Sequence, residues 1–233
     1  MRLLALDAAT EACSVALLCD GEVLLRSLES GKGHARELLA MVDQVLAEGE
    51  LSLSMLDGIA ASVGPGAFSG VRISVAVAQG LAYGADLQAV PITTLQALAM
   101  NVLPDGDARA VACLDARMGE VYWGCFAADA ALGVIEVLGP GVASPKRVLE
   151  ALAGAPAGRQ IGIGRGFSAY PTLEGMGSLE INAEQRRALP QALEIARLGA
   201  LHLNAGGGID PANLQPVYLR DKVALTEAER AAR

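Results

Sequence analysis

The order of apolar and polar stretches along the chain predicts an α/β protein in which one series of elements occurs twice. Apolar segments at residues 2–7, 12–19 and 22–29 have the length and composition of strands, and Asp20-Gly21 between the last two is typical of a hairpin turn. Apolar residues at helical spacing follow at about 34–48. The series ends with a strand at 58–63, a helix at about 69–83, a strand at 89–92 and a helix at 94–102.

A second series begins after Pro104-Asp105-Gly106-Asp107, which has the composition of a linker. It contains strands at 109–114, 119–127 and 134–138, a helix at about 145–152, strands at 160–163 and 179–181, and a helix at about 190–204. Three strands followed by alternating helices and strands, twice over, is the plan of the actin, hexokinase and Hsp70 fold. We therefore expect an α/β, actin-like protein of two similar βββαβαβα halves, at 1–104 and 105–233, that face each other across a cleft. The tail after about residue 210 is a candidate to pack back on the first half.

Composition and charge narrow the classes of function. The chain has 233 residues, of which 52% are hydrophobic and 19% charged, a balance typical of globular domains rather than disordered chains. No apolar run reaches the roughly 18 residues of a membrane span, so we expect a cytoplasmic protein with no membrane contact. The net charge of -8 leaves no basic stripe for binding nucleic acid alone. The four cysteines form no C-x-x-C pair and are expected to be buried, reduced thiols.

One motif is a candidate for a phosphate-binding loop. Gly64-Pro65-Gly66-Ala67-Phe68-Ser69-Gly70 lies between a strand and a helix, where free N–H groups can bind an anion. It lacks the lysine of a Walker loop, and its glycine spacing differs from that of a dinucleotide-binding loop. The alternative is a tight turn that lets the helix pack close to the sheet. The candidate remnant of a phosphate or nucleotide site comprises Asp7, Thr10, Gly64, Gly66 and Asp115. The alternative for the two acids is that they are turn residues, as acids at strand ends often are.

Catalytic and metal-binding residues are not evident. The chain contains two histidines, His34 and His202, and position 38, where a second helical metal ligand would stand, is Leu38. So few histidines make neither a metal site nor a Ser-His-Asp or Cys-His arrangement credible. We therefore predict no catalytic residue and no metal site.

Four motifs in order give the chain a specific resemblance. They are Leu4-Ala5-Leu6-Asp7 with 9–17, the segment 64–73, the segment 115–123, and Pro216-Val217-Tyr218-Leu219-Arg220. Together they resemble the TsaB (YeaZ) family of bacteria, over nearly the whole chain. Ala8 stands where that family usually has threonine, and Ala67 and Ser69 replace serine and threonine. These departures weaken any claim that this chain binds a nucleotide.

The resemblance implies the non-catalytic, scaffolding subunit of the complex that makes threonylcarbamoyladenosine on tRNA. Its partners would be a TsaD-like catalytic subunit and a TsaE-like ATPase, and tRNA would bind only through the complex. It implies no cofactor for the chain itself, but leaves open ATP or ADP at the junction with the partner and a homodimer of the isolated chain. The alternative function is a small-molecule kinase or ATPase of the same fold class. A peptidase is a poorer alternative, because the histidine pairings are missing.

A partner surface is expected on the helices at about 34–48 and 69–83. The second helix is apolar almost all round and carries small residues at intervals of four, so it must be covered on more than one side. The chain's own first helix could cover it, but the resemblance favours a partner. We expect the interface to comprise His34, Leu38, Met41, Val42, Arg72, Ser74, Val75, Ala78 and Ala82. An Ala78→Arg variant should then stay folded and fail to bind the partner.

Overall fold

The computed structural model describes residues 1–29, 34–103, 108–154, 158–175 and 179–220. The first half begins with the strands β1 (Arg2–Asp7), β2 (Ala12–Cys19) and β3 (Glu22–Glu29). Asp20 and Gly21 have φ angles of 49° and 98°, so the predicted hairpin turn is present. Then come α1 (His34–Glu48), β4 (Gly58–Ser62), α2 (Phe68–Gly84), β5 (Ala89–Ile92) and α3 (Thr94–Met100), with the 3₁₀ turn η1 (Leu53–Met55).

The second half contains β6 (Arg109–Asp115), β7 (Val121–Asp129), β8 (Gly133–Ala143), α4 (Pro145–Ala153), β9 (Gln160–Ile163) and β10 (Leu179–Glu180). Between β9 and β10 lie α5 (Arg165–Ala169) and the 3₁₀ turn η2 (Pro171–Gly175), which the sequence did not predict. After β10 come η3 (Gln185–Arg187), α6 (Ala192–Asn204) and η4 (Pro211–Asn213). The predicted linker falls on residues 104–107, outside the described part of the chain.

The two sheets have the same strand order, β3-β2-β1-β4-β5 in the first half and β8-β7-β6-β9-β10 in the second. In each sheet the first three strands are antiparallel neighbours and the last two are parallel to the central strand β1 or β6. Element order and strand order therefore repeat together. This confirms the predicted actin-like plan of two similar halves.

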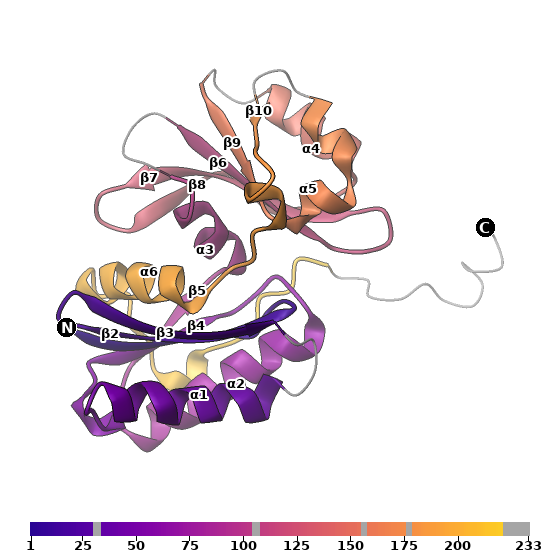
Figure 1. The fold of residues 1–233 in the computed structure, drawn as a ribbon. Helices are drawn as coiled ribbons and strands as arrows, with labels where there is room; N and C mark the ends of the chain where they lie inside the picture. The colour runs from indigo at the N-terminus through magenta and orange to yellow at the C-terminus, as the bar shows by residue number, and fades with distance from the viewer. Residues whose placement is uncertain (30–33, 104–107, 155–157, 176–178, 221–233) are drawn as a thin grey trace.

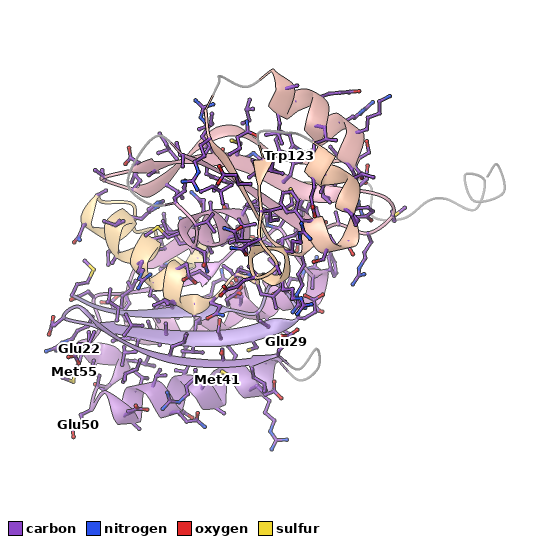
Figure 2. All side chains as sticks on the ribbon, turned by 45° about the horizontal axis from the view of Figure 1, so that its top comes forward. Glu22, Glu29, Met41, Glu50, Met55 and Trp123 are labelled. Carbon is purple, nitrogen blue, oxygen red and sulfur yellow. The ribbon has the colours of Figure 1, made fainter. Side chains whose placement is uncertain are left out.

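Helices and sheets alternate in five layers (Figure 1). Helices α1 and α2 cover the outer face of the first sheet, α6 and α3 lie between the two sheets, and α4 and α5 cover the outer face of the second. Figure 2 shows side chains filling the spaces between these layers, with Trp123 labelled in the second half and Met41 on α1. One core joins both sheets through the middle layer, and two further cores lie under the outer helices.

Each of the two helices in the middle layer packs mainly on the sheet of the other half. Helix α6 follows the second half in sequence, but it packs on β1, β2, β4 and β5 of the first sheet, while α3 packs on β6, β7 and β8 of the second. Gly199 allows this approach, because an added Cβ would lie 2.6 Å from the Cβ of Ala60. The C-terminal part of the chain therefore lies on the first sheet already from α6. Ile209 then pairs with Ala89, and the buried Leu214 packs in the core under α1 and α2.

Two smaller expectations concern cysteines and membranes. Cys13, Cys113 and Cys125 are buried thiols outside any disulfide, and Cys19 is partly exposed. Burial raises the pKa of Cys13 to about 12, so this thiol stays protonated at neutral pH. None of the helices in the described ranges is long and apolar enough to cross a membrane.

Candidate functional site

Four chain segments meet at a cleft of about 550 Å³ between the two halves. They are the β1–β2 turn, the glycine-rich segment before α2, the β6–β7 turn, and α5 with the segment that comes after it. Of the predicted site residues, Thr10, Gly66 and Asp115 line this cleft, whereas Asp7 and Gly64 do not. The fold therefore brings three of the five candidates to one cavity.

One side of the glycine-rich segment packs tightly against the β1–β2 turn. An added Cβ on Gly66 would lie 2.1 Å from the carbonyl oxygen of Ala9, and one on Gly70 would lie 2.0 Å from that of Ala8. The N–H of Ala67 donates to the carbonyl of Ala9 at 2.7 Å. The β1–β2 turn thus packs directly against these two glycines, while the other side of the segment lines the cleft. Their absence of side chains serves close packing, which is the second of the two explanations that the sequence left open.

Asp7 is a buried carboxyl group that does not face the cleft. Its Oδ1 accepts a hydrogen bond from the N–H of Ala9 at 3.0 Å, but its Oδ2 accepts none from the described residues. Burial raises the pKa of Asp7 to about 6, and the nearby Ser62 hydroxyl and the N–H groups of Ala8 and Ala9 offset this only in part. The hydroxyl of Ser62 is also hydrogen-bonded to that of Ser74, at 3.1 Å. In this position Asp7 cannot contact a ligand in the cleft.

Charged side chains around the cleft are paired with one another. Asp115 accepts a hydrogen bond from the N–H of Arg117 at 2.7 Å and forms an ion pair with its guanidinium at 3.0 Å. The hydroxyl of Tyr170 donates to Asp115 at 3.3 Å. Arg165 joins the two halves by an ion pair of 2.6 Å with Glu29, at the end of β3. These pairs leave few free charges for a ligand in the cleft.

A second contact between the halves comes from the C-terminal segment 214–220. The N–H of Val217 donates to the carbonyl of Val63 in the first half at 2.7 Å. In the second half, Arg220 donates to the carbonyl of Ala116 at 2.9 Å and pairs with Glu120 at 2.6 Å. The segment therefore ties the β6–β7 turn to the residue that follows β4.

No group of three His, Cys, Asp or Glu side chains that could hold a metal ion occurs within the ranges that the structure describes. A second cavity, of about 820 Å³, lies on the other side of Arg165 and Leu189 and is lined mostly by polar side chains from η3 and the ends of β3 and α3. It contains none of the predicted site residues.

The predicted partner interface needs correction. Six of its nine residues are buried in the chain's own core beneath α1 and α2, namely Leu38, Val42, Ser74, Val75, Ala78 and Ala82. Ser74 is held there by a hydrogen bond to the carbonyl of Leu6 at 3.2 Å. These side chains pack on the first sheet, so they cannot contact a partner. Arginine at Ala78 would enter this core, and the variant would unfold rather than stay folded.

The remaining interface candidates lie elsewhere. Arg72 is exposed on the outer side of α2. Met41 is partly buried, and Figure 2 labels it on α1. His34 begins α1, but its side chain is outside the described part of the structure. The exposed face of α2 carries Phe68, Arg72, Ala76 and Gly80, which recur every four residues. Phe68 and Tyr218, which are exposed at this face, were not among the predicted interface residues. Arg72 could have identified the face from the sequence, because a charged residue on an otherwise apolar helix marks the side that faces solvent.

Comparison with known proteins matches this fold to one family. Residues 28–170 match the family model of TsaD, tRNA N6-adenosine threonylcarbamoyltransferase. The chain is 35% identical to the tRNA threonylcarbamoyladenosine biosynthesis protein TsaB of Haemophilus influenzae, over 96% of this chain and 95% of that protein. It is 36% identical to TsaB of Escherichia coli, over 96% of each chain. The chain belongs to the TsaB family.

A solved structure agrees with this membership. YeaZ from Pseudomonas aeruginosa superimposes with a TM-score of 0.84 at 36% identity, over 94% of this chain and 99% of that one. The resemblance predicted from the four sequence motifs is thereby confirmed. The match to the TsaD model further indicates that TsaB proteins and the transferase have related folds.

Proposed function

We propose that this chain is a non-catalytic subunit that docks on a TsaD-like transferase and supports the formation of threonylcarbamoyladenosine on tRNA. The proposal rests on the packing of the glycine-rich segment. The chain has the actin-like fold, but its own β1–β2 turn occupies the space beside Gly66 and Gly70. The names of its relatives supply the pathway, since they are biosynthesis proteins of this tRNA modification.

The lack of a reactive arrangement in the cleft supports the non-catalytic role. A kinase or ATPase would need hydrogen-bond donors open to phosphate and a free carboxylate for the metal. Here the N–H of Ala67 is bonded to Ala9, Asp7 is closed off from the cleft, and Asp115 is engaged by Arg117 and Tyr170. The kinase alternative is therefore not favoured.

The exposed face of α2 is the proposed docking surface for the transferase. Its central residues are Ala76 and Gly80, and an added Cβ at Gly80 or at Gly84 would meet no atom within 4 Å. Small side chains let a second helix approach closely, and Tyr83, 80% exposed, extends the apolar surface at the end of the helix. Leu39, exposed on the neighbouring α1, enlarges it. Because the transferase shares the fold, it offers an equivalent helical face for pairing.

The proposed assembly has further members besides the transferase. A second copy of this chain could occupy the docking surface when no transferase is present, giving a homodimer. A TsaE-like ATPase would join the pair, with ATP or ADP at the junction between subunits rather than in this chain. We place the assembly in the cytoplasm. With a net charge of -8, this chain would bind tRNA only through the complex.

A binding experiment with the TsaD-like transferase of the same organism tests the proposal. Gly80→Arg places a long charged side chain in the docking surface, where the folded chain has room for it. Gly175→Arg is the matched control, because Gly175 is exposed in the second half and an added Cβ also meets no atom within 4 Å.

We expect calorimetry to give transferase binding for the wild type and for Gly175→Arg, and none for Gly80→Arg. Circular dichroism should find both variants folded. The isolated wild type should show no ATP turnover. A wild type that fails to bind the transferase, or that hydrolyses ATP steadily, would contradict the proposed function.

A further inference from the structure

Three side chains at the start of α2 and in the C-terminal segment form what we call the arginine–aromatic cluster, Phe68, Arg72 and Tyr218. The Nε of Arg72 donates a hydrogen bond to the hydroxyl of Tyr218 at 2.8 Å. The guanidinium carbon lies 3.5 Å from the ring centroid of Phe68 and 5.5 Å from that of Tyr218. These contacts hold the guanidinium plane in one orientation while both rings remain exposed, at 53% for Phe68 and 49% for Tyr218.

Arg72 is the arginine of this region that lacks a carboxylate. Within the described ranges, no acidic oxygen lies within 4.0 Å of its nitrogens. Its neighbours around the cleft each have such a partner: Asp115 for Arg117, Glu29 for Arg165 and Glu120 for Arg220. Because Nε already bonds to Tyr218, the two terminal nitrogens of Arg72 remain as a pair of donors on one edge of the guanidinium.

A protein bound to the outer face of α2 would bury the two free donors of Arg72. Phe68 and Arg72 lie on the same face of α2 as Ala76 and Gly80, one helical turn apart in each step. A protein that covers the two small residues would also cover Arg72 and remove water from it. A guanidinium that loses its water without gaining an anion is strongly unfavourable.

We infer that Arg72 binds a carboxylate of the partner protein through its two terminal nitrogens, with an apolar partner side chain packed on the exposed ring of Phe68. The inference rests on the proposed function, since it assigns the chemistry of one contact within that docking surface. Two parallel N–H···O bonds are the geometry in which arginine binds carboxylates best. Arginine and aromatic side chains are also the residues that most often dominate binding between proteins.

A nucleic acid is a poorer occupant of this surface. Its phosphates need several unpaired cations, and the strength of binding follows their number. Of the four arginines around the cleft and the cluster, the described part of the structure leaves one without a carboxylate. The exposed side chains beside it, Phe68 and Tyr218, are aromatic, as at the centre of a protein interface.

Calorimetry with the same transferase tests the inference through four variants at low and high salt. Arg72→Gln removes the charge, Arg72→Lys keeps the charge but not the paired donors, and Tyr218→Phe removes only the hydroxyl that orients Nε. Arg147→Gln is the control, because Arg147 is exposed on α4, on the far side of the second sheet. Fluorescent tRNA is titrated in parallel against the wild type and Arg72→Gln.

We expect Arg72→Gln to weaken transferase binding by about 10- to 100-fold and to lose most of its salt dependence. Arg72→Lys and Tyr218→Phe should lie between this variant and the wild type, and Arg147→Gln should bind as the wild type does. If Arg72→Gln binds normally while Gly80→Arg does not bind, the inference is wrong and the proposed function stands. If the wild type does not bind the transferase, both fail. Loss of tRNA binding in Arg72→Gln, with transferase binding unchanged, would assign the cluster to nucleic acid and overturn the inference.

Discussion

Replacing Asp7 by asparagine should stabilise the protein, and increasingly so as the pH rises. Asp7 is fully buried between the first sheet and the middle layer, and its Oδ2 has no hydrogen-bond partner among the described residues. Asparagine has nearly the same shape, is never charged, and can keep the hydrogen bond from the N–H of Ala9 to Oδ1. The variant therefore removes the cost of a buried charge and leaves the packing of the site unchanged.

The size of the effect follows from the pKa. Burial raises the pKa of Asp7 from 3.8 to about 6, so the folded protein binds this proton more tightly than the unfolded chain does. The contribution of Asp7 to stability is therefore largest below pH 3.8 and is lost as the pH rises through 6. A difference of about 2 pKa units corresponds to about 3 kcal/mol at pH 8, and to about half of that at pH 5.

Urea unfolding of the wild type and Asp7→Asn, followed by circular dichroism from pH 5 to pH 8.5, gives the difference in free energy directly. Burial also raises the pKa of Glu194, and the charge of Asp7 contributes to that rise. Neutralising Asp7 therefore lowers the pKa of Glu194 toward its ordinary value, which adds to the stabilisation at high pH. The exposed Asp86→Asn serves as a control for the loss of one negative charge. A stability difference between wild type and Asp7→Asn that does not grow from pH 5 to pH 8.5 would refute this reasoning.

Three further substitutions test packing and the contact between the halves by urea unfolding. Gly70→Ala should lower the free energy of unfolding by several kcal/mol, because the new Cβ would lie 2.0 Å from the carbonyl oxygen of Ala8. Gly80→Ala has open space around the new Cβ and should raise the free energy of unfolding by about 0.5–1 kcal/mol, because alanine favours the helix. Equal effects of these two alanines would contradict the packing described for the glycine-rich segment. Arg220→Ala removes the bonds to Ala116 and Glu120 and should cost about 1–3 kcal/mol, with faster proteolysis of the C-terminal segment; unchanged stability would mean that this segment does not hold the halves together.

The strands and long helices could be predicted from the sequence because their local patterns decide them. Each predicted strand of the first half agrees with the structure to within one residue, and the Asp20-Gly21 turn fixes the register of β2 and β3. The short helix α5 was missed, since five residues are too few to establish a helical period. Its N-terminal Gly164 has a φ of 109°, a conformation that marks a turn but does not by itself predict a helix after the turn.

The orientation of α2 could not be derived from its apolar pattern alone. Two series of small residues run along this helix at intervals of four, and both fit a close contact. The structure turns Gly70, Ser74, Ala78 and Ala82 toward the sheet, while Ala76 and Gly80 face outward. Arg72 lies one turn before Ala76 and thereby identifies the outer face, a signal that the prediction did not use. The return of α6 to the first sheet depends on contacts between distant segments and has no local signal.

The motifs that identify the family in sequence meet at one place in the structure, and the proposed docking role gives a use for a phosphate-loop pattern there. A loop that binds phosphate must leave its N–H groups open, whereas here the β1–β2 turn fills the space beside Gly66 and Gly70. The C-terminal segment covers the next side, through the bond from Val217 to Val63 and the contact of Tyr218 with Arg72. These contacts fix the first turn of α2 and therefore the orientation of Arg72 before any partner arrives. A surface that is rigid before binding loses less conformational entropy in the complex, so the packing around the glycine-rich segment would also prepare the proposed docking surface.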